Sequence, residues 1–442
     1  MTIFLGIIQF IIIALICIYE LCKKSTSVFL WAVLLIMFGF PHMISIIFNK
    51  YDYSESTMNE ASLFVILFSI IYLSIRYLYY RYFYKPKKTE KEDKNKEIKI
   101  EKKFLIVLFI ILICIVTLRI LELARVAGGI SDITWATMRS TDDGYFSFAQ
   151  IFIPVFFASS SCIILSMRLK EKKIMICSII LVMIEVLISK NRIEILPILV
   201  GVIYNYILNI KKVDLRKIVV LGIIGVLTLY SIYGLRVFRH AGSIQNFIDK
   251  YNVRTFNTTV IDYFKNDDGE LSLRNHMYYF IEKDNNFENF GKGHTYLRML
   301  LVLVPTSWSF GIKPTDFAIS MGKAILPDST GFSTHPTLFG DAYANFGFYG
   351  FYIGIFWAIF AIVIDKLNIN LSKTISLTIS FVVSIFYIIQ GRGSVYNAFA
   401  WCTYSIILLF IVYELVKNIN KENIIKIYEK IIKKEGRMKN EN

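Results

Sequence analysis

Long apolar runs limit the folds that this chain can adopt more than any other feature of its sequence. A run of about twenty apolar residues crosses the hydrocarbon core of a bilayer as one α-helix. Such runs recur along the 442 residues, of which 55% are hydrophobic, and they are too long and too poor in charge for soluble cores. We therefore predict an all-α, polytopic membrane protein. The eleven predicted spans cover residues 2–22, 27–48, 61–80, 104–124, 146–167, 174–189, 193–209, 218–235, 343–364, 375–390 and 396–416.

The basic residues predict the orientation of these spans. The formal net charge is +15, but Lys and Arg concentrate in every second gap between the apolar runs. This is the positive-inside pattern of cytoplasmic loops, so the charge does not indicate nucleic-acid binding. We expect an external N-terminus and a cytoplasmic C-terminus. The predicted division is eight spans in 1–235, an external region in 236–342, three spans in 343–416 and a basic cytoplasmic tail in 417–442.

Two segments fall outside this regular alternation. Segment 297–312 is apolar but contains Arg298 and Pro305, and counting it as a span would place the basic tail outside. We interpret it as a re-entrant or interfacial helix. The basic segment 81–103 predicts a solvated cytoplasmic linker that can contact anionic headgroups.

No pattern predicts a metal site. The six cysteines lie within or at the ends of apolar runs, without the spacing of metal ligands or of a disulfide framework. The doublets Asp142-Asp143 and Asp267-Asp268 each precede glycine, which is typical of turns.

Charged residues inside the predicted spans are costly and need a reason. Arg76 lies near the cytoplasmic end of its span, so its side chain can extend to the headgroups. Glu122 is spaced to neutralise either Arg119 or Arg125 on the same helix, which suits a structural role as well as a functional one.

Glu185 lies near the middle of its predicted span. Ser189 and Arg192 continue the same helical stripe toward the external surface if the helix extends that far. The two cations of the turn Lys190-Asn191-Arg192, held by nearby carboxylates, are a candidate phosphate seat. The alternative is an ordinary charged turn at the headgroups.

Further arginines are predicted on the external face, against the positive-inside tendency. Arg236, Arg239 and His240 share one helix face where span 218–235 ends. Arg392 lies between two glycines, which allow a ligand to approach the backbone closely. We predict that Arg192, Arg236 and Arg392 bind an anionic group, provided that packing brings them together.

His335 is a candidate general base. Pro336 restricts it to extended conformations, which can point the imidazole outward from a fixed loop. A histidine that only bonds to the backbone is the alternative. Asp341 precedes the helix expected from Ala342 onward, so it is a candidate cap and also an alternative catalytic group.

A polar block set among the predicted spans, Gly291 to Gly354, carries a resemblance to a known family. Its elements are Gly293-His294-Thr295-Tyr296, Pro305 with Lys313-Pro314, and the run TLFGDAYANFG from Thr337 to Gly347. This block resembles the bacterial O-antigen and capsule polymerases of the Wzy type, which join oligosaccharide repeat units. One departure is that no arginine here has a glycine eleven residues later, so the arginine-x10-glycine repeats of some members are absent.

The resemblance implies a membrane-embedded, glycosyltransferase-C-like enzyme of the bacterial cytoplasmic membrane. Donor and acceptor would be oligosaccharides on undecaprenyl diphosphate, and further partners would be membrane lipids, a chain-length regulator and a flippase. No cofactor, metal or nucleic acid is expected. The leaving group is already anionic, so arginines can stabilise it. The implied catalytic residues are His335, Arg192, Arg392 and Asp341, and the implied substrate-binding residues are Arg236, Arg239, His240, Lys313, Tyr343 and Arg298.

Two other functions are compatible with the sequence. An O-antigen ligase would use the same chemistry but a different acceptor. A polysaccharide or lipid flippase would also be basic and polytopic, although it should show repeated halves, and the sequence has no internal repeat of fixed period.

Overall fold

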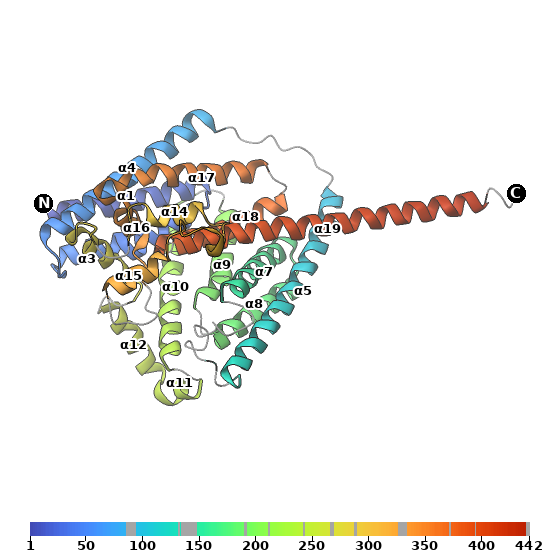
Figure 1. The fold of residues 1–442 in the computed structure, drawn as a ribbon, viewed down its shortest axis with the longest axis horizontal. Coiled ribbons are helices and arrows are strands. Elements are labelled where there is room, and N and C mark those ends of the chain that lie inside the picture. Colours follow the sequence, from blue (N-terminus) through green and yellow to red (C-terminus); the bar gives the residue numbers. More distant parts are fainter. Residues whose placement is uncertain are drawn as a thin grey trace. The chain divides into compact units, whose positions relative to one another are not determined.

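The chain is all-helical wherever its structure is described. In the computed structural model, the described residues form α-helices with short 3-10 and π segments and no strand (Figure 1). This confirms the all-α part of the predicted fold class for those residues. The structure describes residues 1–84, 94–130, 133, 148–189, 192–210, 213–241, 244–265, 269–286, 290–325, 334–370, 373–393 and 395–438.

Within these residues, eight helices are long and apolar enough to cross a membrane. They support a multi-pass membrane protein. The other three predicted spans, at 146–167, 174–189 and 193–209, are helical where they are described but are not among the eight, so the count of eleven stays a prediction. The eight are Thr2–Lys23, Val28–Ile47, Glu55–Phe83, Glu101–Ala127, Leu215–Ala241, Thr337–Leu367, Thr374–Arg392 and Val395–Asn418.

The chain divides into two compact units that alternate along the sequence. Unit one comprises Met1–Lys87 and Lys190–Thr403, and unit two comprises Lys88–Ser189 and Tyr404–Asn442. This division by packing is of a different kind from the predicted division by topology, which stays a prediction.

Unit one packs its first helices against its last. In Figure 1, α4 lies beside both α1 and α17, while α18 packs on α2, α9 and α16. Its elements are α1 (Thr2–Lys23), α2 (Val28–Leu34), η1 (Leu35–Gly39), α3 (Phe40–Ile47), α4 (Glu55–Leu78), η2 (Tyr79–Phe83), η4 (Arg192–Ile195), α9 (Leu196–Asn209), α10 (Leu215–Ala241), α11 (Ile244–Lys250), α12 (Val253–Lys265), η5 (Leu271–Arg274), α13 (Asn275–Glu282), α14 (His294–Leu300), η6 (Thr306–Trp308), α15 (Phe317–Ile325), α16 (Thr337–Phe346), η7 (Gly347–Tyr352), α17 (Ile353–Asn370), α18 (Lys373–Arg392) and the start of α19 (Val395–Met438).

Unit two is built on α5 (Lys94–Ala127), which packs on α7 (Phe148–Leu169) and α8 (Lys172–Ser189). Helix α5 begins ten residues before the predicted span, inside the segment predicted as a linker. Glu185 of α8 forms a buried ion pair with Arg119 of α5, at 2.8 Å. Glu122 pairs with Arg125 instead. Glu185 is thus held by an arginine of the same unit.

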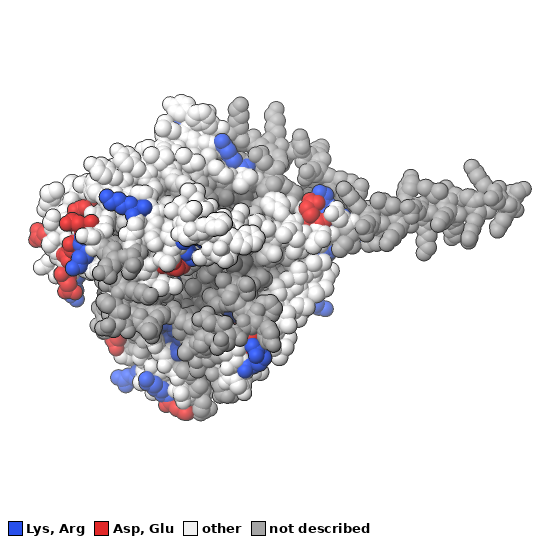
Figure 2. Space-filling model, in the orientation of Figure 1, with Lys and Arg blue, Asp and Glu red and all other residues white. Residues whose placement is uncertain are grey.

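Helix α1 shows how these helices divide their surfaces. Gly6, Ile13 and Ile16 are buried, whereas Phe4 and Ile11 are exposed on the opposite face. This pattern is typical of a helix with one face on protein and one on lipid. Among the described residues drawn in Figure 2, the charged side chains form small groups with uncharged areas between them.

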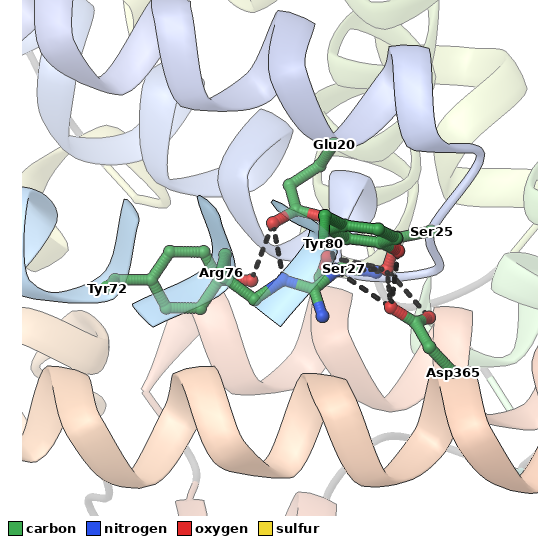
Figure 3. A network of polar contacts seen from close by, with 7 residues as sticks. All are labelled: Glu20, Ser25, Ser27, Tyr72, Arg76, Tyr80 and Asp365. Carbon is green, nitrogen blue, oxygen red and sulfur yellow. Dashed lines mark hydrogen bonds and ion pairs between the residues drawn. The ribbon is translucent and has the colours of Figure 1, made fainter. Parts of the chain in front are cut away.

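A buried ion network joins three helices of unit one (Figure 3). Arg76 of α4 forms a two-pronged contact with Glu20 of α1, with Nε to Oε1 at 2.8 Å and Nη2 to Oε2 at 2.6 Å. Its Nη2 also lies 2.8 Å from Oδ2 of Asp365 on α17. The side chains of Arg76 and Glu20 are 0% exposed and that of Asp365 is 10% exposed.

Hydroxyl groups complete this network. Tyr72 donates to Glu20 at 3.2 Å, Tyr80 donates to Asp365 at 3.0 Å, and Ser25 donates to Asp365 at 3.0 Å. The two carboxylates therefore have further donors besides the one guanidinium. The prediction that Arg76 extends to the headgroups is wrong, because its charge is fully enclosed by protein groups.

Removing the arginine should strongly destabilise unit one. In Arg76→Ala, Glu20 would keep a buried charge without its cation, which costs about 3–5 kcal/mol. We expect a clearly lower midpoint of thermal unfolding for the purified protein in detergent. Arg81→Ala is the matched control, since Arg81 is exposed in the adjoining η2. Equal midpoints for the two variants would contradict the structural role of the network.

The segment predicted as a helix over 297–312 is broken. Helix α14 ends at Leu300, turns follow, and η6 covers only Thr306–Trp308. The segment is not one of the eight apolar helices, and its placement at the membrane stays a prediction.

Candidate functional site

The two halves of the motif that carries the resemblance are in direct contact. The backbone N–H of Thr295 donates to Oδ1 of Asn345 at 3.0 Å, and Nδ2 of Asn345 donates to Oγ1 of Thr295 at 3.1 Å. The backbone N–H of Gly293 donates to the carbonyl of Asn345 at 3.1 Å. Residues fifty positions apart thus form one buried polar joint between α14 and α16.

Asp341 belongs to the interior of this joint. Helix α16 begins at Thr337, with Pro336 at its N-cap, so the prediction that Asp341 caps the helix is wrong. Asp341 is 0% exposed. Burial raises the pKa of Tyr296 well above its ordinary value, and the nearby Asp341 carboxyl raises it further. Asp341 therefore has no direct access to a substrate in this structure.

Two basic residues of the motif converge on Tyr396. Arg298 donates to the carbonyl of Pro314, and its guanidinium lies 4.2 Å from the centre of the Tyr396 ring. Lys313 donates to the carbonyl of Val304 at 2.6 Å, with its Nζ 5.4 Å from the same ring centre. Both cations thus pin their own segment to the start of α19.

Arg392 forms an ion pair at the end of α18. Its Nε lies 2.5 Å from Oε2 of Glu270, and its Nη2 lies 3.3 Å from Oε1. The Glu270 side chain is only 4% exposed, against 21% for Arg392. The arginine thus keeps an accessible edge while its carboxylate partner is buried.

The backbone around Arg392 is tightly fitted to the motif helix. Gly393 has φ +100°, and a Cβ added there would collide with the backbone nitrogen of Thr337. Thr337 itself has φ +64°, an uncommon value for a β-branched residue. Strained backbone of this kind concentrates at functional sites.

Arg236 reaches the same turn as Arg392. A Cβ added at Gly269 would collide with Nη1 of Arg236, so only glycine leaves room for this side chain. The guanidinium lies 4.6 Å from the centre of the Tyr263 ring. Because Gly269 precedes Glu270, Arg236 and Arg392 contact neighbouring residues of one turn. We call Arg236, Arg392 and the Gly269-Glu270 turn the arginine cluster.

The other predicted cations lie at different distances from this cluster. His240 is in contact with Arg236, at 3.5 Å between Nε2 and Nε, and Arg239 lies in the same last turn of α10. The side chain of Arg192 lies outside the described part of the structure. Its segment, η4, contacts α10. Helix α8 ends at Ser189 and Arg192 begins η4, so the two residues belong to different elements, and residues 190–191 lie outside the described part of the chain.

His335 lies in the segment without regular secondary structure that leads into α16. The preceding Thr334 is anchored on both sides, by its N–H to the carbonyl of Ala318 at 3.2 Å and by its hydroxyl to Nε2 of His276 at 2.8 Å. Nδ1 of His276 lies 2.9 Å from the carbonyl of Leu273, where it can act only as a donor. The neutral form of His276 therefore carries its proton on Nδ1 and accepts at Nε2 from the Thr334 hydroxyl.

Tyr343 is separate from the arginine cluster. Its hydroxyl donates to Glu60 of α4 at 2.5 Å. Glu60 lines a cavity of about 430 Å³ together with Ser56, Asn59 and Phe348. Across the described residues, no group of three or more His, Cys, Asp or Glu side chains could hold a metal ion. The doublet Asp142-Asp143 and the doublet Asp267-Asp268 lie outside the described residues.

Comparison with known proteins gives no match. No protein-family model, no curated protein and no solved structure is similar to the chain at a significant level.

The sequence alone did not indicate three members of this region. Glu270, Tyr263 and Tyr396 lie in mixed polar and aromatic stretches, where nothing distinguishes them from their neighbours. The sequence Asp267-Asp268-Gly269 was the available signal, since a glycine in a predicted turn allows a close approach to the backbone. What approaches it is the Arg236 guanidinium.

Substitution of Gly393 should disturb the arginine cluster. In Gly393→Ala, the added methyl would collide with the backbone of Thr337 and push the Arg392 turn away. Gly128→Ala is the matched control, because Gly128 has φ +83° but no atom lies within 4 Å of the place that a Cβ would take. The control should lose only the free energy needed to hold alanine in the left-handed conformation, about 1–2 kcal/mol. We expect a distinctly larger loss of thermal stability for Gly393→Ala, and equal losses would contradict the fit.

Acidification should weaken the segment that carries His335. Burial lowers the pKa of His276 and of His294 below the ordinary value of 6.5. The unfolded chain then binds more protons than the folded chain, so this contribution is complete above about pH 6.5 and is lost as the pH falls toward the lowered pKa values. His276→Asn with His294→Asn should flatten the dependence of the unfolding midpoint on pH. His240→Gln, at an exposed histidine, should leave it unchanged.

Proposed function

We propose that the chain polymerises oligosaccharide repeat units carried on undecaprenyl diphosphate, on the external face of the bacterial cytoplasmic membrane. In this proposal it is a glycosyltransferase-C-like enzyme, and donor and acceptor are both lipid-linked glycans. The observation that carries the proposal is the meeting of Arg236 and Arg392 at the Gly269-Glu270 turn. The motif of the Wzy-type resemblance adjoins this turn through Gly393 and Thr337.

The chemistry needs an anion site more than a strong base. A hydroxyl oxygen of the acceptor sugar forms a bond to the anomeric carbon of the donor. The bond from that carbon to the phosphate oxygen breaks, and the lipid diphosphate leaves with the electron pair. Guanidinium groups bind phosphate oxygens in pairs of parallel hydrogen bonds, which stabilises this leaving group.

Glu270 fits a holding role in this scheme. It keeps the Arg392 side chain extended while the site is free, with one arginine edge accessible at 21% exposure. A diphosphate would bind that exposed edge of Arg392. The guanidinium would then face the negative charge of the diphosphate as well as that of Glu270. The acceptor proton would pass to His335 or directly to a phosphate oxygen.

Other motif residues support the site indirectly. Asp341 is buried, so we assign it a positioning role through Tyr296 rather than contact with substrate. Arg298 and Lys313 hold the segment before α15 against Tyr396. Tyr343, bound to Glu60, is placed to shape the adjoining cavity rather than the diphosphate site.

Purified protein with only lipid-linked repeat units should produce a ladder of polymer lengths. Arg392→Ala should lower the rate about 100-fold or more, which is typical of losing one donor to a developing anion. Arg392→Lys should also lose activity, because lysine cannot form the paired contact. Arg254→Ala is the matched control, an exposed arginine of α12 in the same unit. Full activity of both Arg392 variants would rule out this site.

Cells that lack the protein separate the proposal from its alternatives. Loss of a polymerase should leave single repeat units exposed on the external face. Loss of a flippase should leave them facing the cytoplasm, and loss of a ligase should leave long polymer on its lipid. Either of the last two results would overturn the proposed reaction.

A further inference from the structure

Five apolar side chains of the stretch Leu300–Ile312 are exposed in the described part of the chain. Phe310 is 94% exposed, Trp308 is 73% exposed, and Leu300, Leu303 and Ile312 are 77%, 59% and 64% exposed. The stretch between Arg298 and Lys313 contains no charged residue. We call Leu300–Ile312 the apolar wedge.

The base of the apolar wedge is fixed to unit one. Arg298 and Lys313 flank it and turn back onto the ring of Tyr396. Lys313 also donates to the carbonyl of Val304 at 2.6 Å, which closes the stretch into a loop. The two cations thus lie at the base, while the apolar side chains extend away from it.

The backbone of the apolar wedge limits how deeply it can enter a bilayer. It is a series of turns, with Val304, Trp308 and Ile312 donating to carbonyls three residues earlier, at 3.1, 3.0 and 2.8 Å. Irregular backbone exposed to lipid is not stable in the hydrocarbon core, because water is absent there to satisfy its remaining polar groups. At the boundary between headgroups and acyl chains, water can still hydrogen-bond to the backbone. The apolar side chains can at the same time be buried among the acyl chains.

Its neighbours indicate that the occupant is lipid. Tyr296 of α14, just before the wedge, contacts Phe356 of α17, with ring centres 6.3 Å apart. Helix α17 lies in one of the eight apolar helices and exposes Ile355, Ile359 and Val363 at helical spacing. The wedge therefore begins beside a helix with a lipid-facing stripe. Tryptophan is also the residue enriched at membrane interfaces.

We propose that the apolar wedge is a membrane-contact surface, in which Trp308 and Phe310 lie at the boundary between lipid headgroups and acyl chains. The hydrophobic effect drives this contact, since each exposed aromatic side chain leaves water. Arg298 and Lys313 mark the polar edge of the inserted part. The proposal depends on the membrane character of the chain and not on the polymerase activity.

A fluorescent amino acid encoded at position 310 of the full chain tests the proposal. The protein is placed in vesicles of phosphatidylcholine and phosphatidylglycerol, with bromine near the headgroup or near the end of the acyl chains. We expect strong quenching by bromine near the headgroup, weaker quenching by bromine near the chain end, and little quenching by aqueous iodide. A second label at position 308 should behave in the same way.

Two matched positions calibrate this experiment. Lys283 is exposed in a polar turn of unit one and should be quenched by iodide, whereas Ile359 of α17 should be quenched by lipid bromine. Iodide quenching at position 310 equal to that at Lys283 would overturn the proposal. Protection from both quenchers would also overturn it, because another protein surface would then cover the wedge.

Discussion

The contact of Arg76 with Glu20 and Asp365 determines how helices α1, α4 and α17 meet. Two N–H groups of the Arg76 guanidinium donate to the Glu20 carboxylate in one plane and at one distance. This paired contact fixes both the rotation and the axial position of α4 against α1. A buried charge without its partner is far more costly than a mismatched apolar contact. Because α4 also packs on α13 and η7, the same register is transmitted to the elements next to the motif helix.

Much of the fold could be predicted because the bilayer restricts the possible answers. Apolar runs of sufficient length must form helices, and those runs are visible without any knowledge of packing. The pairing of charges was not predictable in the same way. Glu20 and Asp365 stand at the ends of apolar runs, where charges normally meet water. Only their approach to Arg76, across 56 and 289 residues, makes them a buried network.

The candidate site was predictable in its residue types but not in its geometry. Arg236 and Arg392 were predicted as anion-binding residues because they depart from the positive-inside tendency. The structure brings both to one turn. The buried partner Glu270 was not foreseen, because a single glutamate in a polar stretch has no distinguishing pattern. Asp341 shows that a motif can also suggest a role that the structure does not support. Its place in a recognisable motif suggested chemistry, but a sequence motif does not reveal burial, and its carboxyl lies inside the α14–α16 joint.

That joint also has a consequence for how the chain can vary. Thr295 and Asn345 are fifty positions apart and hydrogen-bonded to each other, so the residues between them form a closed loop with fixed ends. The entropy of closing a flexible loop grows slowly with length, by about 0.6 kcal/mol for each doubling. The apolar wedge and the approach to His335 both lie within this loop. Insertions in the turns of this loop are therefore thermodynamically inexpensive, and the loop can change in length while the helices beneath it keep their packing.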